Sequence, residues 1–236
     1  MNGRGFGSVR FLCLNGAMAH EFVNRDAAGA RLADRLAGMD WHDPVVLALP
    51  RGGVPVALPV ARALDAPLDL CLVRKIGMPG HEEYAAGAVV DGDPPITVFN
   101  EGILEAAGLT ERDFAEVTRD KIRQIAVRRE TYLAGRSPEP LEARDVILVD
   151  DGIATGATVR AALKGLSQSG ARRVVLAVPV APGDSLADLA EMVDETICLE
   201  TPVPFFAVGM HYRDFEQVSD EEVVAMLAEF KRGEYE

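Results

Sequence analysis

The sequence has few cysteines and no long hydrophobic run. Its three cysteines, Cys13, Cys71 and Cys198, lack the spacing of a metal site, and a sparse, odd set is typical of a reducing compartment. No run of about 18 apolar residues occurs, so no membrane-spanning helix is expected. These shortages predict a cytoplasmic protein that has no membrane among its partners.

Positive charge is also scarce. The chain has 24 Lys and Arg against 37 Asp and Glu, which gives a net charge of -13. Because Lys and Arg that neutralise phosphates supply most of the affinity for nucleic acid, we expect no nucleic-acid partner. An anionic ligand would need a local cluster of cations.

The remaining composition is that of a globular protein, with 48% hydrophobic and 26% charged residues. Arg4, Arg10 and a short apolar patch faintly resemble a signal peptide, but Asn15-Gly16 follows the patch at once. We therefore expect residues 1–20 to form a disordered tail, with a start site placed upstream of Met18 as the alternative, and residues 21–236 to form a single domain.

Short apolar runs alternate with helical patterns along the chain. Strands are predicted at residues 45–49, 68–73, 96–99, 146–149, 174–180 and 196–199. Helices are predicted at residues 22–39, 54–64, 110–133, 156–169, 185–192 and 221–231. Such alternation predicts an α/β fold with a doubly wound parallel sheet.

The most informative stretch is Val-Ile-Leu-Val-Asp-Asp-Gly-Ile-Ala-Thr-Gly-Ala-Thr at residues 146–158. A buried strand ends there in Asp150 and Asp151, and a turn of small residues leads into a helix. Ligands of open α/β sheets bind at such strand ends. The turn and the helix N-terminus suit a phosphate, and the two carboxylates suit the hydroxyls of a ribose or the water around Mg²⁺.

Two further segments follow predicted strands. In Pro50-Arg51-Gly52-Gly53, the glycines allow close approach to an anion and the arginine adds charge, although a plain tight turn fits equally well. Arg74 and Lys75 open a glycine-punctuated segment that runs to Gly92 without strong periodicity. A solvated surface loop with a chance basic pair is the alternative for this segment.

Taken together, these motifs resemble those of the type I phosphoribosyltransferases, which use phosphoribosyl diphosphate (PRPP). Arg74-Lys75-Ile76-Gly77 and Glu82-Glu83-Tyr84-Ala85 are also similar to bacterial phosphoribosyltransferases of unknown acceptor. The resemblance implies a doubly wound sheet with a small hood lobe, Mg²⁺ as the cofactor and a homodimer. It marks residues 110–133 as a helical insertion and residues 200–236 as a possible hood or base-side segment.

By this resemblance, Asp150 and Asp151 bind the ribose hydroxyls and, through the ribose or water, the metal. Arg51, Gly52 and Gly53 bind the pyrophosphate, and a cis non-proline peptide is expected at Arg51-Gly52. The 5-phosphate is held by the turn of Ala154, Thr155, Gly156, Ala157 and Thr158.

The resemblance also suggests catalytic residues. The segment that begins with Arg74 and Lys75 corresponds to a mobile loop that closes over the site, where the two cations stabilise the departing pyrophosphate. Ala154 stands where 6-oxopurine enzymes have an aspartate that moves the proton of the base. Glu82 or Glu83 is therefore the candidate general base.

Phe206 and Ala207 resemble a base-binding segment, in which Phe206 would stack on the base and the Ala207 backbone would contact its edge. A pair of core phenylalanines at Phe205 and Phe206 is the favoured interpretation, because buried aromatics are common. Arg128 and Arg129 are expected on a solvated helix face. Surface or loop positions are expected for His20, His42, His81 and His211.

The predicted function is transfer of the ribose 5-phosphate group of PRPP to a nitrogenous base or another nucleophile, with release of pyrophosphate. A PRPP- or nucleotide-sensing regulator with the same fold and no catalysis is the alternative, since fold does not fix function. A dinucleotide-binding dehydrogenase is disfavoured, because no Gly-x-Gly-x-x-Gly turn follows the first strand.

Overall fold

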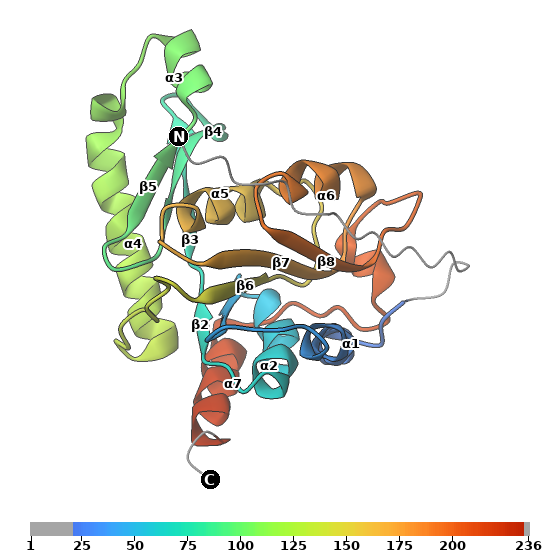
Figure 1. The fold of residues 1–236 in the computed structure, drawn as a ribbon. Coiled ribbons are helices and arrows are strands. Elements are labelled where there is room, and N and C mark those ends of the chain that lie inside the picture. The colour runs from blue at the N-terminus through green and yellow to red at the C-terminus, as the bar shows by residue number, and fades with distance from the viewer. Residues whose placement is uncertain (1–20, 234–236) are drawn as a thin grey trace.

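The computed structural model describes residues 21–233, which are built around a five-stranded parallel sheet (Figure 1). The strands are β1 (Val45–Ala48), β2 (Leu68–Leu70), β6 (Asp145–Val149), β7 (Arg173–Val180) and β8 (Glu195–Glu200). Their order is β2-β1-β6-β7-β8, so the direction of winding reverses between β1 and β6. Ligands of doubly wound folds bind at the carboxyl ends of the strands at this switch point. The predicted fold class is confirmed.

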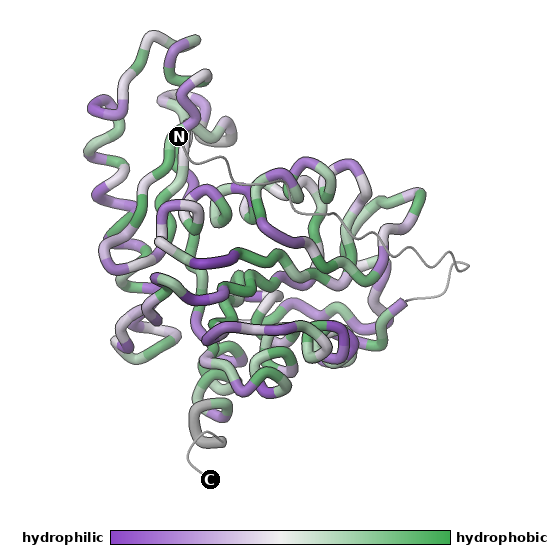
Figure 2. The backbone as a smooth tube through the Cα atoms, viewed as in Figure 1, coloured by the Kyte–Doolittle hydropathy of each residue, from purple (hydrophilic) through white to green (hydrophobic). Residues whose placement is uncertain are grey.

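Helices cover both faces of this sheet. Figure 1 shows α1 (Arg25–Ala37), α2 (Gly53–Ala63) and α7 (Asp220–Gly233) on one face, and α5 (Ala157–Leu166) and α6 (Gly183–Ala190) on the other. Every residue of β1 and β6 is buried, as expected for central parallel strands. Figure 2 shows these strands as mainly hydrophobic. Within the described part of the chain, no helix is both long and apolar enough to cross a membrane.

A second, antiparallel sheet forms a small lobe at one end of the molecule (Figure 1). Its strands are β3 (Val73–Met78), β4 (His81–Val90) and β5 (Ile96–Phe99). The chain continues through α3 (Glu101–Ala107) and the 3-10 turn η1 (Glu111–Phe114) into α4 (Ala115–Leu133). The last short element before α7 is the 3-10 turn η2 (Val208–His211). Residues 1–20, the expected disordered tail, lie outside the described residues.

The small sheet corrects two predictions. The segment of residues 74–92, expected as an irregular loop, is mostly a β-hairpin of β3 and β4. It can form because the small residues of β4 fit between β3 and β5. A Cβ on Gly87 would lie 2.4 Å from the Val98 carbonyl oxygen, so only glycine fits there without a shift. The single strand expected at residues 68–73 is divided, since β2 ends at Leu70 in the large sheet and β3 begins at Val73 in the small one.

The long helix α4 corrects a third prediction. Arg129 does not face solvent: its side chain is 10% exposed and its Nη2 donates to Asp69 Oδ2 at 2.7 Å. Its Nη1 pairs with Asp91, near the end of β4. The partners that bury Arg129 are distant in the sequence, so the helical pattern of residues 110–133 did not reveal this buried cation. These ion pairs attach α4 to both sheets.

Candidate functional site

The loop at residues 50–53 and the paired aspartates meet where β1 and β6 end. Ala48 pairs with Val149 in the sheet, so both segments emerge at the same edge. A Cβ added to Gly52 would lie 2.0 Å from Asp151 Oδ2, and one on Gly53 would lie 2.8 Å from the Val149 carbonyl oxygen. The two glycines therefore allow the loop to rest directly on the aspartates. Two of the sequence motifs thus form one surface.

A cis peptide bond joins Pro50 to Arg51. The expected loop does contain a cis non-proline peptide, but its predicted position at Arg51-Gly52 is wrong by one residue. Gly52 has helical backbone angles, φ -62° and ψ -30°, and the Val54 N–H donates to the Arg51 carbonyl at 3.1 Å. The Arg51-Gly52 bond therefore leads into the N-cap of α2, and it has the trans form that peptide bonds almost always take.

Asp150 and Asp151 are held in fixed positions by their neighbours. Arg25 Nε donates to Asp151 Oδ2 at 2.7 Å, and the Tyr212 hydroxyl donates to the Asp151 carbonyl at 2.5 Å. The Asp151 N–H donates to Asp150 Oδ1 at 2.9 Å. Burial raises the pKa of Asp150, and the neighbouring Asp151 carboxylate raises it further. Two crowded carboxylates of this kind favour hydroxyl donors or a cation.

The turn of residues 154–158 leads into α5 at the same edge. Ala154, Thr155, Ala157 and Thr158 are exposed, whereas Gly156 is buried with φ +70°. Within residues 21–233, no side chain caps the N-terminus of α5. The first N–H groups of a helix have no partner within the helix, so this end is suited to an anion such as a phosphate.

The predicted cations do not all lie together. Arg51 Nη1 lies 3.4 Å from Asp220 Oδ1, and Arg74 Nη1 donates to the Val73 carbonyl at 3.0 Å. Lys75 is exposed and, as the next residue in a strand, points to the other face of β3. It lines a cavity of about 570 Å³ with Asp113 and other residues near the start of α4. The structure therefore does not bring Lys75 together with Arg51.

The aromatic pair is divided between the interior and the surface. Phe206 is 72% exposed, so its interpretation as a core residue is wrong. Phe205 is partly buried and stacks on His211 with ring centroids 5.2 Å apart. Because Phe205 already packs against the small cluster around Phe22 and Tyr212, Phe206 turns outward. Ala207 is also exposed.

The two glutamates predicted as the general base are placed by their backbone alone. Glu82 and Glu83 lie in β4, and their side chains are outside the described part of the structure. Two further residues of the site, Arg25 and Tyr212, hold Asp151 and were not predicted from the sequence. No local pattern marks either residue, because their contacts span 126 and 61 positions of the chain.

Comparisons with known proteins identify the family. A family model described as a phosphoribosyl transferase domain matches residues 19–214. The chain belongs to this family. The resemblance seen in the three motifs is thereby confirmed.

Individual proteins similar to this phosphoribosyl transferase domain support the family assignment. Two curated proteins of Mycobacterium tuberculosis, from strains CDC 1551 / Oshkosh and H37Rv, carry provisional phosphoribosyl transferase names and are 47% identical over 206 residues. The match covers 87% of this chain but 46% of each relative, so the chain spans about half their length. The crystal structure of TT1426 from Thermus thermophilus is similar with a TM-score of 0.78 and 43% identity, over 89% of this chain and 99% of that one.

Proposed function

We propose that this phosphoribosyl transferase domain transfers the ribose 5-phosphate group of PRPP to a nitrogenous base or another nucleophile, with release of pyrophosphate. The observation that carries the proposal is the contact of Gly52 with the Asp151 carboxylate. It joins an anion-binding loop to a pair of carboxylates beside the open N-terminus of α5. PRPP requires these three features together: a pyrophosphate site, a site for two ribose hydroxyls and a phosphate site.

In this proposal, the site works by positioning and electrostatics. Asp150 and Asp151 accept hydrogen bonds from the ribose hydroxyls and fix the sugar while its anomeric carbon gains positive charge. The 154–158 turn, Ala154 and Gly156 included, holds the 5-phosphate through backbone N–H groups, with the hydroxyls of Thr155 and Thr158. Arg51 and Arg74 stabilise the negative charge that develops on pyrophosphate as the glycosidic bond breaks.

The residues present fit Mg²⁺ when PRPP is bound. Protein sites hold Mg²⁺ through one or two carboxylates together with substrate phosphates and waters. Asp150 and Asp151 supply that number of carboxylates, whereas residues 21–233 contain no group of three or more His, Cys, Asp or Glu arranged for a metal. Asp150 and Asp151 would hold the ion through water or the ribose, and the ion would supply charge neutralisation to the pyrophosphate.

The acceptor side is proposed to include Phe206 and Ala207. The exposed Phe206 ring is free of the core and is suited to stack on a planar base. Glu82 and Glu83 remain the candidates for the general base, and a homodimer in the cytoplasm remains a prediction.

The test is to incubate the purified protein with Mg²⁺, PRPP and a panel of nucleobases and other nucleophiles, and to measure pyrophosphate release. A variant with both Asp150→Asn and Asp151→Asn should lose PRPP binding, whereas the exposed Asp188→Asn should retain it. Unchanged PRPP affinity in the double variant would show that the site is assigned wrongly. Tight PRPP binding without turnover on any acceptor would favour the sensor function instead.

A further inference from the structure

Two segments of the chain bring hydrogen-bond donors to the start of α7. Arg128 Nη2, from α4, lies 2.9 Å from Asp220 Oδ1, and Arg51 Nη1, from the 50–53 loop, lies 3.4 Å from the same oxygen. The Tyr132 hydroxyl donates to this oxygen at 2.6 Å. A single carboxylate oxygen thus receives three donors from two distant parts of the sequence.

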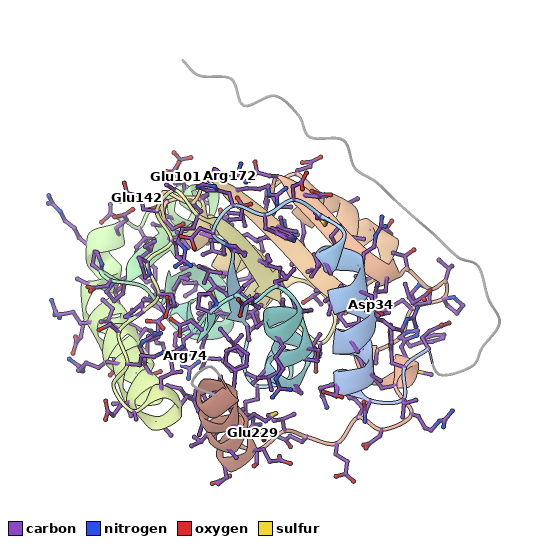
Figure 3. The ribbon with its side chains drawn as sticks, turned by 60° about the horizontal axis from the view of Figure 1, so that its bottom comes forward. Asp34, Arg74, Glu101, Glu142, Arg172 and Glu229 are labelled. Carbon is purple, nitrogen blue, oxygen red and sulfur yellow. The ribbon has the colours of Figure 1, made fainter. Side chains whose placement is uncertain are left out.

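Arg74 adds a third arginine to the same region. Figure 3 shows Arg74 beside α4 and α7, the helices that carry Arg128 and Asp220. Burial lowers the pKa of Arg74, and the positive charge of Arg128 lowers it further. Among the residues that the structure describes, no carboxylate forms an ion pair with Arg74; its guanidinium donates to the Val73 carbonyl.

The local charge is therefore unbalanced. Among the described residues, Asp220 is the one carboxylate that forms ion pairs with Arg51 and Arg128, and Arg74 forms no ion pair. The chain as a whole has a net charge of -13, so this concentration of positive charge is local and is not a general property of the surface. Guanidiniums held near one another without enough counter-charge favour an anion with several negative charges.

We propose that Arg51, Arg74 and Arg128 form one site for the pyrophosphate group of PRPP, in which Asp220 is a resident carboxylate that the pyrophosphate displaces. The nature of the ligand rests on the function proposed above. Arg128 on α4 and Asp220 on α7 are new to that site. Arg128 adds a third arginine to the pyrophosphate site. Asp220 adds a carboxylate of the protein itself, which competes with pyrophosphate for the arginines.

The connection to the ribose site runs through the 50–53 loop. Arg51 is followed by Gly52, which rests on Asp151, so a ligand that spans the aspartates and Arg51 is directed toward Arg128. Asp220 keeps its negative charge at neutral pH, because the hydrogen bond from Tyr132 and the charges of Arg128 and Arg51 lower its pKa. The side chains of Asp220 and both arginines are 31–37% exposed, so solvent can reach the ion pairs during the exchange.

The exchange needs no covalent chemistry. The Asp220 carboxylate presents one negative charge and uses one oxygen for Arg51, Arg128 and Tyr132. A pyrophosphate group presents more oxygens and more charge, so it can contact Arg74 as well as the other two arginines. We therefore expect inorganic pyrophosphate to bind more tightly than inorganic phosphate.

The experiment is calorimetric titration of the full chain with inorganic pyrophosphate, and separately with ribose 5-phosphate. Arg128→Gln should weaken pyrophosphate binding about 10- to 100-fold, the loss expected for one charged hydrogen-bonding group, and should leave ribose 5-phosphate binding unchanged. The matched control is Arg123→Gln, on the exposed face of the same helix. Equal pyrophosphate affinities for these two variants would overturn the role of Arg128.

Asp220→Asn tests the competing carboxylate. Removal of its charge should tighten pyrophosphate binding about 3- to 10-fold, because pyrophosphate then no longer has to break the ion pairs of Asp220 with Arg51 and Arg128. Glu221→Gln removes the same charge from the next residue, which is exposed in the same helical turn, and controls for the effect on the helix end. If Asp220→Asn binds pyrophosphate no more tightly than Glu221→Gln, the exchange does not occur.

These titrations separate this inference from the proposed function. Pyrophosphate binding that responds to Arg128 and Asp220 as expected, without transfer to any acceptor, would support the anion site and count against the transferase activity. Transfer activity together with pyrophosphate binding that is insensitive to both residues would support the transferase activity and overturn the anion site. Circular dichroism and thermal unfolding of each variant show whether a lost affinity reflects a lost fold.

Discussion

Arg25 Nε and Asp151 Oδ2 lie 2.7 Å apart, although 126 positions separate the two residues in the chain. Both side chains are nearly buried, with 11% and 15% exposed. The Arg25 guanidinium also lies 3.7 Å from the centre of the Phe215 ring and donates to the Glu216 carbonyl at 2.8 Å. The start of α1 and the segment after η2 thus orient one carboxylate of the candidate site together.

Replacing this arginine should therefore weaken PRPP binding. In Arg25→Gln, Asp151 loses its charged partner, so its pKa rises and its orientation is no longer fixed. We expect about a tenfold loss of PRPP affinity, equivalent to about 1.4 kcal/mol, as measured by calorimetry. Arg31→Gln, which removes an arginine of the same helix that pairs with Glu200, is the control. Equal affinities of the two variants would show that Arg25 has no positioning role.

Gly52→Ala should affect the site more than the fold. The new Cβ would lie 2.0 Å from Asp151 Oδ2, a distance that forces the carboxylate or the loop to move. We expect PRPP affinity to fall at least tenfold, because small displacements in a positioned site are costly. Gly183→Ala, at a position with open space around it, should leave affinity unchanged. Retention of full affinity in Gly52→Ala would mean that the close contact does not define the site.

Removal of the buried cation of α4 should destabilise the protein strongly. Arg129→Gln leaves the carboxylates of Asp69 and Asp91 without their main partner, and breaking a buried pair costs about 3–5 kcal/mol. Urea unfolding measures this loss. Arg123→Gln, with its exposed partner Asp120, should change stability by less than about 0.5 kcal/mol. A loss as small as that of Arg123→Gln would contradict an anchoring role for Arg129.

The stability of the fold should decrease in acid partly through Asp145. Burial tends to raise the pKa of Asp145, but the hydrogen bonds and charges of Arg172, the His42 N–H and Arg173 outweigh it, so its pKa lies below the usual 3.8. A lowered pKa contributes stability above pH 3.8, and this contribution is lost as the pH falls further. Asp145→Asn should cost about 1–3 kcal/mol at pH 7.

The comparison of unfolding curves from pH 6 to about pH 3 tests that assignment. Below pH 3.8, Asp145→Asn should lose stability less steeply than the unchanged protein, because it has no carboxylate to protonate at this position. Parallel curves for the two proteins would show that another acidic group controls the acid dependence. Asp188→Asn, whose side chain is largely exposed, is the matched control.

The sequence was sufficient for the parts of the molecule whose patterns are local. The apolar run before Asp150 predicted β6, and all five residues of this strand are buried. The position of the 50–53 loop and Asp151 at one edge of the sheet was also expected, because both follow strands and the carboxyl ends of parallel strands share one edge.

Features that depend on distant contacts could not be predicted. The small residues of β4 have weak intrinsic preference for a strand, and they adopt one because β3 and β5 pair with them on both sides. Arg129 is buried by partners 60 and 38 positions away, and no helical periodicity reveals those partners. Phe206 was assigned to the core by composition alone, whereas its neighbour Phe205 fills the available space.

The buried pairing of Arg129 has a consequence for Arg128, the residue before it. Because Arg129 is fastened to Asp69 and Asp91, α4 cannot roll or slide without breaking ion pairs inside the protein. The backbone that carries Arg128 is therefore already immobilised when a ligand arrives, and the ordering cost of that backbone has been met during folding. Arg129 thus holds α4 in place, and in the proposed pyrophosphate site Arg128 on the same helix contacts the ligand.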